Sequence, residues 1–451
     1  MSAAAQLEHV YRYAFPSHVE PGWGLHLATS GSAADESATP YFFEGKLEHP
    51  EELAKMLLLL SDVVRSRFYL PGAMRQLDPV VTCSDQVVRF EGFSSCCGVY
   101  VRVDAEGDSF EHGLKGRGTT NVDFNSPMRA ALGRIRADEE VRLAVGADEV
   151  KLTRSEGSAV EKKVQLPLRW LKAFLEVQAY QARLQHRLEV DGVTLRRFLR
   201  TLPKSGGPKR RVFVVPAGRE LRLTQRESKD GVPVMGTDRL SVLASVLAPS
   251  QRVNVWVDPG TGVSGWEVSG AGTRALVLLS PEVYRGFSGE GQALRQLAGS
   301  NWEGALASVR AKLKWQSELD ASALARELGR PLSDVEAALA VLGSRGLVGF
   351  DATRGVYFHR ELPFDLSQLE TLQPRLKAAR GLVTDGKVRL NAELREAVVE
   401  GSDVQHRVRL LEDGDRCTCR WFSKHQGQRG PCKHILAARI SLEGDEDSEQ
   451  R

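Results

Sequence analysis

The sequence predicts a multidomain α+β protein, and three observations lead to this class. The chain has 451 residues, which is enough for three or four domains, and its 42% hydrophobic and 26% charged content is typical of globular proteins. Segments with helical spacing of apolar residues occur beside segments rich in β-branched residues, with glycine and proline between them. Near the end of the chain, cysteines and a histidine have the spacing of a zinc site.

Composition and charge narrow the function classes. The net charge of +3 is too small to indicate a polyanionic partner by itself, so any nucleic-acid affinity would have to come from local patches. No run approaches 18 uncharged apolar residues, and residues 1–6 do not begin a signal peptide, so we expect no membrane segment. Six cysteines, three of them assigned to a metal, suit a reducing compartment, and a cytoplasmic location is expected.

Residues 1–160 are predicted to form a first α+β domain. A core-facing helix should begin at Pro50 and end before Pro71, because apolar residues recur there at helical spacing. Strands are expected at 80–82, 86–91, 99–103, 141–145 and 150–153. Cys83, Cys96 and Cys97 fall among them and are interpreted as buried small hydrophobic residues, with a redox role or a second metal site as the alternatives.

Residues 161–300 are predicted to form a second α+β domain. An amphipathic helix should run from about residue 164 to 188, and a shorter one from 195 to 202. The basic loop 203–211 follows, and it lacks the Lys-Ser/Thr ending of a phosphate-binding loop. Strands are expected at 212–215, 221–224, 253–257, 263–268 and 275–279.

Residues 301–362 are predicted to form a winged-helix-like module. Helices are expected at 307–313, 321–328 and 334–344, and the wing at 347–359. The third helix would enter the groove if the module bound DNA. Its exposed positions include Ser333, Asp334 and Glu336, and the two acidic side chains repel phosphate. A protein-docking role and a DNA-reading role therefore both stay open.

Residues 363–441 contain the most specific pattern in the chain. Cys417-Thr-Cys419, twelve intervening residues and Cys432-Lys-His434 offer three thiolates and one imidazole to a single Zn²⁺, which accepts such a tetrahedral set. The surrounding residues predict a ββα unit, with the first pair on a hairpin and the second at a helix start. Because protein would fill all four positions, we expect one structural zinc ion. The alternatives are ordinary thiols beside an unrelated histidine, or a disulfide.

Basic and aromatic residues surround these four ligands. Such a mixture can bind phosphates through its charges and bases through its ring faces. The candidate nucleic-acid or partner-binding residues are Arg420, Trp421, Lys424, Arg429, Lys433 and Arg439. The alternative is a solvated basic loop in which Trp421 packs over the zinc knuckle. Residues 442–451 are expected to form an acidic, disordered tail.

The Cys-x-Cys and Cys-x-His pairs, followed by an apolar helix, resemble the SWIM zinc finger over about residues 400–441. A wider resemblance, to stand-alone bacterial SWIM proteins, rests on further stretches spread over nearly the whole chain. These stretches are residues 26–31, 42–45, 65–69, 89–100, 119–125 and 280–291. The resemblance implies a genomic association with a MoxR-type AAA+ ATPase and a von Willebrand factor A protein. It also implies an adaptor role with one of them as the protein partner.

Three function classes follow from these features. The first is a non-enzymatic zinc protein that binds protein or DNA as an adaptor to such an ATPase system. The alternative is a DNA-binding regulator that uses the winged helix and the basic zinc knuckle together. An enzyme is not expected, because the sequence has no Walker motif, no nucleophile elbow and no metal set with an open position.

Overall fold

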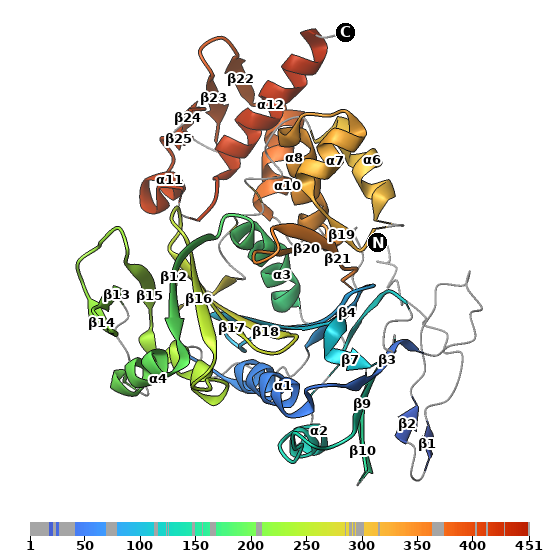
Figure 1. Ribbon diagram of the computed structural model, residues 1–451. Helices are drawn as coiled ribbons and strands as arrows, with labels where there is room; N and C mark the ends of the chain where they lie inside the picture. The colour runs from blue at the N-terminus through green and yellow to red at the C-terminus, as the bar shows by residue number, and fades with distance from the viewer. Residues whose placement is uncertain are drawn as a thin grey trace, which may run out of the picture.

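The computed structural model (Figure 1) describes the chain from residue 41 onward with short gaps, and two short strands before it. The described ranges are 18–20, 24–26, 41–68, 79–111, 116–122, 124, 126–146, 149–155, 157–162, 168–203, 210–284, 286–287, 291, 294, 302–313, 316–362, 374–401, 404–411, 414–427 and 429–449. Strands β1 (His18–Glu20) and β2 (Gly24–His26) form an antiparallel pair.

The largest element is an eight-stranded antiparallel sheet. In spatial order its strands are β12 (Gln185–Asp191), β16 (Arg252–Asp258), β17 (Val263–Ser269), β18 (Thr273–Leu279), β6 (Val99–Glu106), β5 (Val87–Phe93), β4 (Val80–Cys83) and β8 (Gly118–Asn121). Strand β18 pairs with β6 along its whole length, from Thr273 opposite Ala105 to Leu279 opposite Val99. The two N-terminal units that the sequence predicts as separate therefore share one sheet, because backbone pairing joins strands from both sides of residue 160.

One hydrophobic core covers this sheet. Helix α1 (Pro50–Arg65) buries its apolar side against β5 and β6, and α3 (Leu168–Gln181) adds Trp170 and Phe174 to the same core. Gly92 allows the close approach of α1, since a Cβ atom there would lie 2.7 Å from a methyl group of Val64. Cys83, Cys96 and Cys97 are all buried, in agreement with their interpretation as small hydrophobic residues.

The helix predicted to reach residue 188 ends at Gln181, and this prediction was too long. Residues Gln185–Asp191 instead form β12, which pairs with β16 at the edge of the sheet. The backbone hydrogen bonds of that edge outweigh the local helical pattern of a largely polar segment.

Two smaller sheets lie beside the large one. The first, in spatial order, consists of β11 (Gly157–Lys162), β10 (Glu149–Arg154), β9 (Val141–Gly146), β3 (Tyr41–Leu47) and β7 (Phe110–Glu111), with α2 (Ser126–Leu132) against it. The second consists of β14 (Glu220–Thr224), β13 (Arg211–Ala217) and β15 (Val232–Met235). Helix α4 (Gly192–Thr201) packs against β14, and a 3₁₀ segment (Thr237–Ser245) follows β15.

Residues 303–359, called the helical module below, contain the three helices and the hairpin that the sequence predicts. The elements are α6 (Glu303–Lys312), β19 (Glu318–Leu319), α7 (Ala321–Leu328), α8 (Leu332–Ser344), β20 (Val348–Asp351) and β21 (Val356–His359). The strands form a small antiparallel sheet in the order β19-β21-β20. The module has its own hydrophobic core, to which Val309, Leu324 and Leu339 belong.

The C-terminal unit extends well beyond the predicted ββα motif. It consists of α10 (Pro374–Thr384), a sheet of β22 (Val388–Asn391), β23 (Glu396–Glu400), β24 (Gln405–Arg409) and β25 (Arg416–Cys417), and the helices α11 (Arg420–His425) and α12 (Lys433–Glu449). Helix α12 packs against α10 and continues to Glu449, through residues that the sequence predicts as a disordered acidic tail. The buried first half of α12 is stabilised by packing. Extending an existing helix costs much less free energy than starting one, so the polar second half continues as helix.

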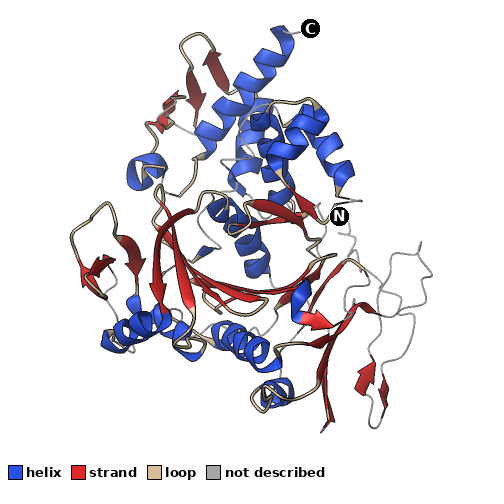
Figure 2. Cartoon of the chain, in the orientation of Figure 1, coloured by secondary structure: helices blue, strands red, loops and turns tan. Residues whose placement is uncertain are grey.

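Figure 2 shows that helices lie close together in the upper half of the view, where the helical module and α12 are found, whereas the large sheet lies below them. None of the helices in the described ranges combines the length and the apolar composition that crossing a bilayer requires.

Candidate metal centre

The four predicted ligands come from three short elements of the C-terminal unit. Cys417 ends β25, whose partner strand β24 lies beside it with Val408 opposite Cys417. Cys419 is the N-cap of α11, a helix that the sequence analysis did not predict. Cys432 and His434 lie at the start of α12, as predicted. The two pairs thus approach each other from a hairpin end and a helix start.

The ligand atoms have the separation that one zinc ion needs. The three sulfur atoms and a ring nitrogen of His434 all lie within 4.8 Å of one another, and all four residues are buried. The distance from Cys417 Sγ to His434 Nδ1 is 3.8 Å. Tetrahedral coordination with Zn–S of about 2.3 Å and Zn–N of about 2.0–2.1 Å places neighbouring ligand atoms about 3.5–3.8 Å apart. The cluster therefore fits a single tetrahedral zinc ion.

Backbone amides support the sulfur ligands. The N–H of Cys419 donates to Cys417 Sγ at 3.4 Å, that of Phe422 to Cys419 Sγ at 3.4 Å, and that of Ile435 to Cys432 Sγ at 3.5 Å. Each bond stabilises negative charge on the sulfur that accepts it and fixes its direction. The ring of His434 lies against that of His406, with centroids 4.3 Å apart, which holds its Nδ1 toward the sulfur atoms.

The sulfur cluster favours a thiolate even before metal binds. Hydrogen bonds from the thiols of Cys417 and Cys432 hold the pKa of Cys419 well below its ordinary value. To hold Zn²⁺, Cys417 and Cys432 would also have to lose their thiol protons, because the metal binds thiolates. Because protein supplies all four ligands, no coordination position is left for a substrate or an activated water. The site is that of one structural Zn²⁺.

The zinc ligands are also part of a hydrophobic core. Cys417, Cys419 and Cys432 belong to the same buried cluster as Val408 and Leu436. A zinc ion held by these ligands would therefore cross-link β25, α11 and α12 within this core.

Two of the predicted binding residues, Trp421 and Arg429, contact each other within the chain. The guanidinium groups of two arginines lie over the ring of Trp421, with Arg375 Cζ 4.8 Å and Arg429 Cζ 5.0 Å from its centroid. Arg375 Nη1 also donates to the carbonyl oxygens of Arg429 and Pro431, each at 2.9 Å. Arg429 is itself buried. Trp421 therefore packs beside the zinc loop, which is the alternative that the sequence left open for it.

The other four predicted cations divide into one paired and three accessible side chains. Arg439 donates to both carboxylate oxygens of Asp415, at 2.6 and 2.9 Å. Arg420 and Lys424 are exposed on α11, and Lys433 is partly exposed at the start of α12. Only these last three offer charge to a partner without breaking an interaction described above.

The zinc loop also contacts a distant loop of the chain. Gly430 and Gly291 both have positive φ, and a Cβ on Gly430 would lie 2.0 Å from the carbonyl oxygen of Gly291. The segment that ends at Gly291 also contacts the strand region, where Phe287 N donates to the carbonyl of Cys97 at 2.7 Å. These contacts explain Gly291 and Gly430, and they connect the zinc unit to the large sheet.

Residues 406–442 match the family model described as SWIM zinc finger. No curated protein sequence matches the chain. Among solved structures, proliferating cellular nuclear antigen from Entamoeba histolytica is similar at 12% identity and a TM-score of 0.36, over 54% of this chain and 99% of that one. The A. fulgidus PCNA bound by the C-terminal region of FEN-1 is similar at 11% identity and a TM-score of 0.36, over 53% and 97%. The matched residues contain the Cys₃His cluster described above, and residues 406–442 are a SWIM zinc finger domain.

Proposed function

We propose that the chain is a non-enzymatic interaction protein, an adaptor whose SWIM finger is held in shape by one zinc ion. The observation that carries this proposal is the closed, buried Cys₃His cluster, which has no open position for chemistry. The finger presents Arg420, Lys424 and Lys433 at its surface for contact with a protein or a nucleic acid.

The helical module supports the adaptor role over DNA reading. We propose that this module is a winged helix, and its element order and its β19-β21-β20 sheet support this proposal. Helix α8 would be the groove-reading helix, but its residues from Ala338 to Ser344 are buried. Part of this burial comes from α3, because a Cβ on Gly343 would lie 2.5 Å from the Gln178 side chain. The second half of α8 therefore packs within its own chain, whereas the exposed start of the helix carries Ser333 and Glu336 and offers no positive charge to DNA.

The hairpin of the module also contacts its own chain, through arginines of the large sheet. Asp351, at the end of β20, accepts from Arg274 of β18 at 2.9 Å and lies 3.0 Å from Arg102 of β6. Arg102 Nη1 also donates to the carbonyl of Phe350 at 2.8 Å. Buried charge pairs thus fix the base of the wing to the large sheet, which supports docking within the chain, while the turn from Thr353 to Gly355 is exposed. A DNA-binding regulator remains the second candidate, through the exposed cations of the finger.

The resemblance to stand-alone bacterial SWIM proteins suggests the partner, a MoxR-type AAA+ ATPase or a von Willebrand factor A protein in the cytoplasm. The six cysteines carry no disulfide, which is compatible with that compartment.

Affinity purification of the tagged full chain, after nuclease treatment, tests the proposal. Such a partner should be retained by the wild type and by Cys83→Ala, which removes a buried thiol outside the finger, and lost with Cys432→Ser. Retention of the partner by all three proteins would show that binding does not require the folded finger. A partner that is lost on nuclease treatment would favour the DNA-binding alternative.

A further inference from the structure

A strongly basic surface lies far from the zinc finger in sequence. Residues 192–230 contain eleven Lys and Arg but only three Asp and Glu, a net charge of +8, whereas the whole chain carries +3. The described part of this segment consists of α4 and the β13–β14 hairpin, which pack against each other. Charge of this density over a short segment produces a local positive field that the net charge of the chain conceals.

Most arginine side chains of this surface make no ion pair or hydrogen bond within the described part of the chain. Seven of them have side chains that form no ion pair or hydrogen bond with another described residue: Arg196, Arg197, Arg200, Arg210, Arg219, Arg222 and Arg226. Six are exposed and Arg196 is partly exposed. Elsewhere, exposed arginines such as Arg389 and Arg409 pair with Glu400 and Glu396, both at 2.7 Å. The acidic residues within the segment, Glu220, Glu227 and Asp230, are also exposed and pair with none of the seven.

Local structure explains why these side chains face solvent. On α4, Leu195, Phe198 and Leu199 are buried, so Arg197 and Arg200 lie on the opposite side of the helix. In the hairpin, Val214 pairs with Leu223 and Val215 with Arg222, so successive residues of β14 alternate between its two faces. Arg197, Arg200 and Arg222 are therefore exposed on α4 and on β14, the edge strand of the β14-β13-β15 sheet. Figure 1 shows this helix and this sheet beside each other.

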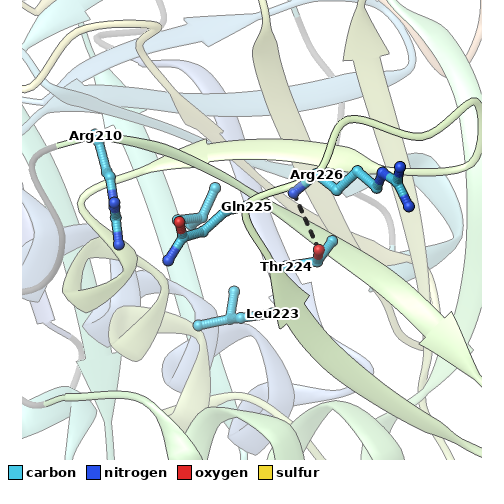
Figure 3. Close-up of a pocket in the computed structure, with 6 residues that line it drawn as sticks. Arg210, Leu223, Thr224, Gln225 and Arg226 are labelled. Carbon is cyan, nitrogen blue, oxygen red and sulfur yellow. Dashed lines mark hydrogen bonds between the residues drawn. The ribbon is translucent and has the colours of Figure 1, made fainter.

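The open end of the hairpin holds a pocket of about 510 Å³ lined by Arg210, Val212, Leu223, Thr224, Gln225 and Arg226. Figure 3 shows the side chains of Arg210, Gln225 and Leu223 on the same side of the hairpin, whereas that of Arg226 extends away from them. Thr224 Oγ1 accepts from the N–H of Arg226 at 3.1 Å, which fixes the turn at this end. The pocket thus combines a cation, an amide and an apolar floor.

We propose that α4 and the β13–β14 hairpin form a nucleic-acid-binding surface. The exposed arginines contact backbone phosphates, and the pocket beside Arg210 accepts a sugar or a base edge. Guanidinium groups match phosphate oxygens in bidentate geometry, and a β-ribbon can enter a nucleic-acid groove. Gln225 supplies the donor and acceptor that base-edge contacts use.

The composition of this surface favours nucleic acid over a membrane. Surfaces that bind membranes insert aromatic or large aliphatic side chains below the headgroups. In the described part of residues 192–230, Phe198 and Phe213 are buried, and the exposed large apolar side chains are only Val193 and Leu223, at 37% and 36% exposure. The surface is also separate from the SWIM finger, so this proposal does not depend on the function proposed above.

Fluorescence anisotropy of the zinc-loaded full chain tests the proposal, with labelled single-stranded and duplex oligonucleotides at about 50 to 200 mM salt. The wild type should bind at least one of them with an affinity that falls steeply with salt. The triple variant Arg210→Gln, Arg222→Gln, Arg226→Gln should bind at least about tenfold more weakly, and the slope of log affinity against log salt should decrease by about 2 to 3.

The matched control is Arg142→Gln, Arg389→Gln, Arg409→Gln, which removes the same charge from exposed arginines that pair with carboxylates. It should change the affinity by less than about twofold, in contrast to the tenfold loss from the surface itself. An equal loss of affinity in both triple variants would mean that net charge alone determines binding, and it would overturn the proposal. So would the absence of salt-dependent binding by the wild type, or tighter binding to phosphatidylserine vesicles or to polyglutamate than to any oligonucleotide.

Discussion

Asp351 of the helical module accepts a hydrogen bond from Arg274 of the large sheet at 2.9 Å, and both side chains are buried. Arg102 and Arg89 also lie within ion-pair distance of Asp351, at 3.0 and 3.3 Å. One carboxylate thus holds three arginines, from β5, β6 and β18. This cluster is the polar centre of the contact between the module and the sheet.

Replacing Asp351 with Asn should destabilise this contact strongly. The arginines would lose one of the two carboxylates that they share, the other being Asp104, while staying buried. Breaking a buried ion pair on one side costs about 3–5 kcal/mol. Urea-induced unfolding should show the loss. The control is Asp385→Asn, which breaks an exposed pair with Lys387 and should cost less than about 1 kcal/mol. A similar, small effect of both substitutions would contradict the assigned role of Asp351.

The same cluster should make the stability of the folded protein depend on pH in the acidic range. Burial opposes ionisation, but the charges of Arg102, Arg274 and Arg89 outweigh it and hold the pKa of Asp351 far below its ordinary value of 3.8. A group whose pKa is lower in the folded state than in the unfolded state stabilises the folded protein at pH values above its unfolded pKa. This stabilisation is lost as the pH falls below that value. The wild type should therefore lose stability below about pH 4 more steeply than Asp351→Asn, as measured by urea midpoints across that range. Parallel curves for the two proteins would contradict this expectation.

Arg375 should control how firmly zinc is held. Its Nη1 donates to the carbonyls of Arg429 and Pro431, directly before the ligand Cys432. Supporting contacts of this kind contribute about 10- to 100-fold to metal affinity. Arg375→Gln should therefore lose zinc to a chelator at least about tenfold more readily. Lys377→Gln, an exposed change on the same helix, should match the wild type. Equal zinc loss in the two variants would remove this role.

Removal of a zinc ligand should unfold the C-terminal unit and spare the rest. The ligands belong to the core of that unit, whereas the large sheet and the helical module have separate cores. In limited proteolysis, Cys432→Ser or His434→Ala should be cleaved within residues 374–449 while the fragment before them survives. Cys83→Ala, outside the finger, should keep the wild-type pattern. Resistance of the ligand variants equal to that of the wild type would contradict a structural zinc.

The sequence predicted the local features of this protein well. The zinc ligands could be found because cysteine and histidine spacing directly encodes a tetrahedral site. Helix α1 and strands β4, β5 and β6 could be found because their apolar residues follow helical or strand periodicity. The helices and hairpin of residues 303–359 were located for the same reason.

Long-range pairing was not accessible in this way. The pairing of β18 with β6 joins residues more than 160 positions apart, and no local pattern specifies it. Burial of Arg89, Arg102 and Arg274 could not be predicted either, because arginine normally indicates a surface. These three pair with Asp104 and with Asp351, which comes from another part of the chain. Similarly, the roles of Trp421 and Arg429 depend on Arg375, which precedes the finger.

Zinc stoichiometry tests the central claim most directly. Elemental analysis of the purified wild type should give one zinc ion per chain, and Cys432→Ser should lose it while Cys83→Ala retains it. No zinc in the wild type, or equal zinc in all three proteins, would contradict a structural zinc ion at Cys417, Cys419, Cys432 and His434, and the proposed adaptor function would lose its basis.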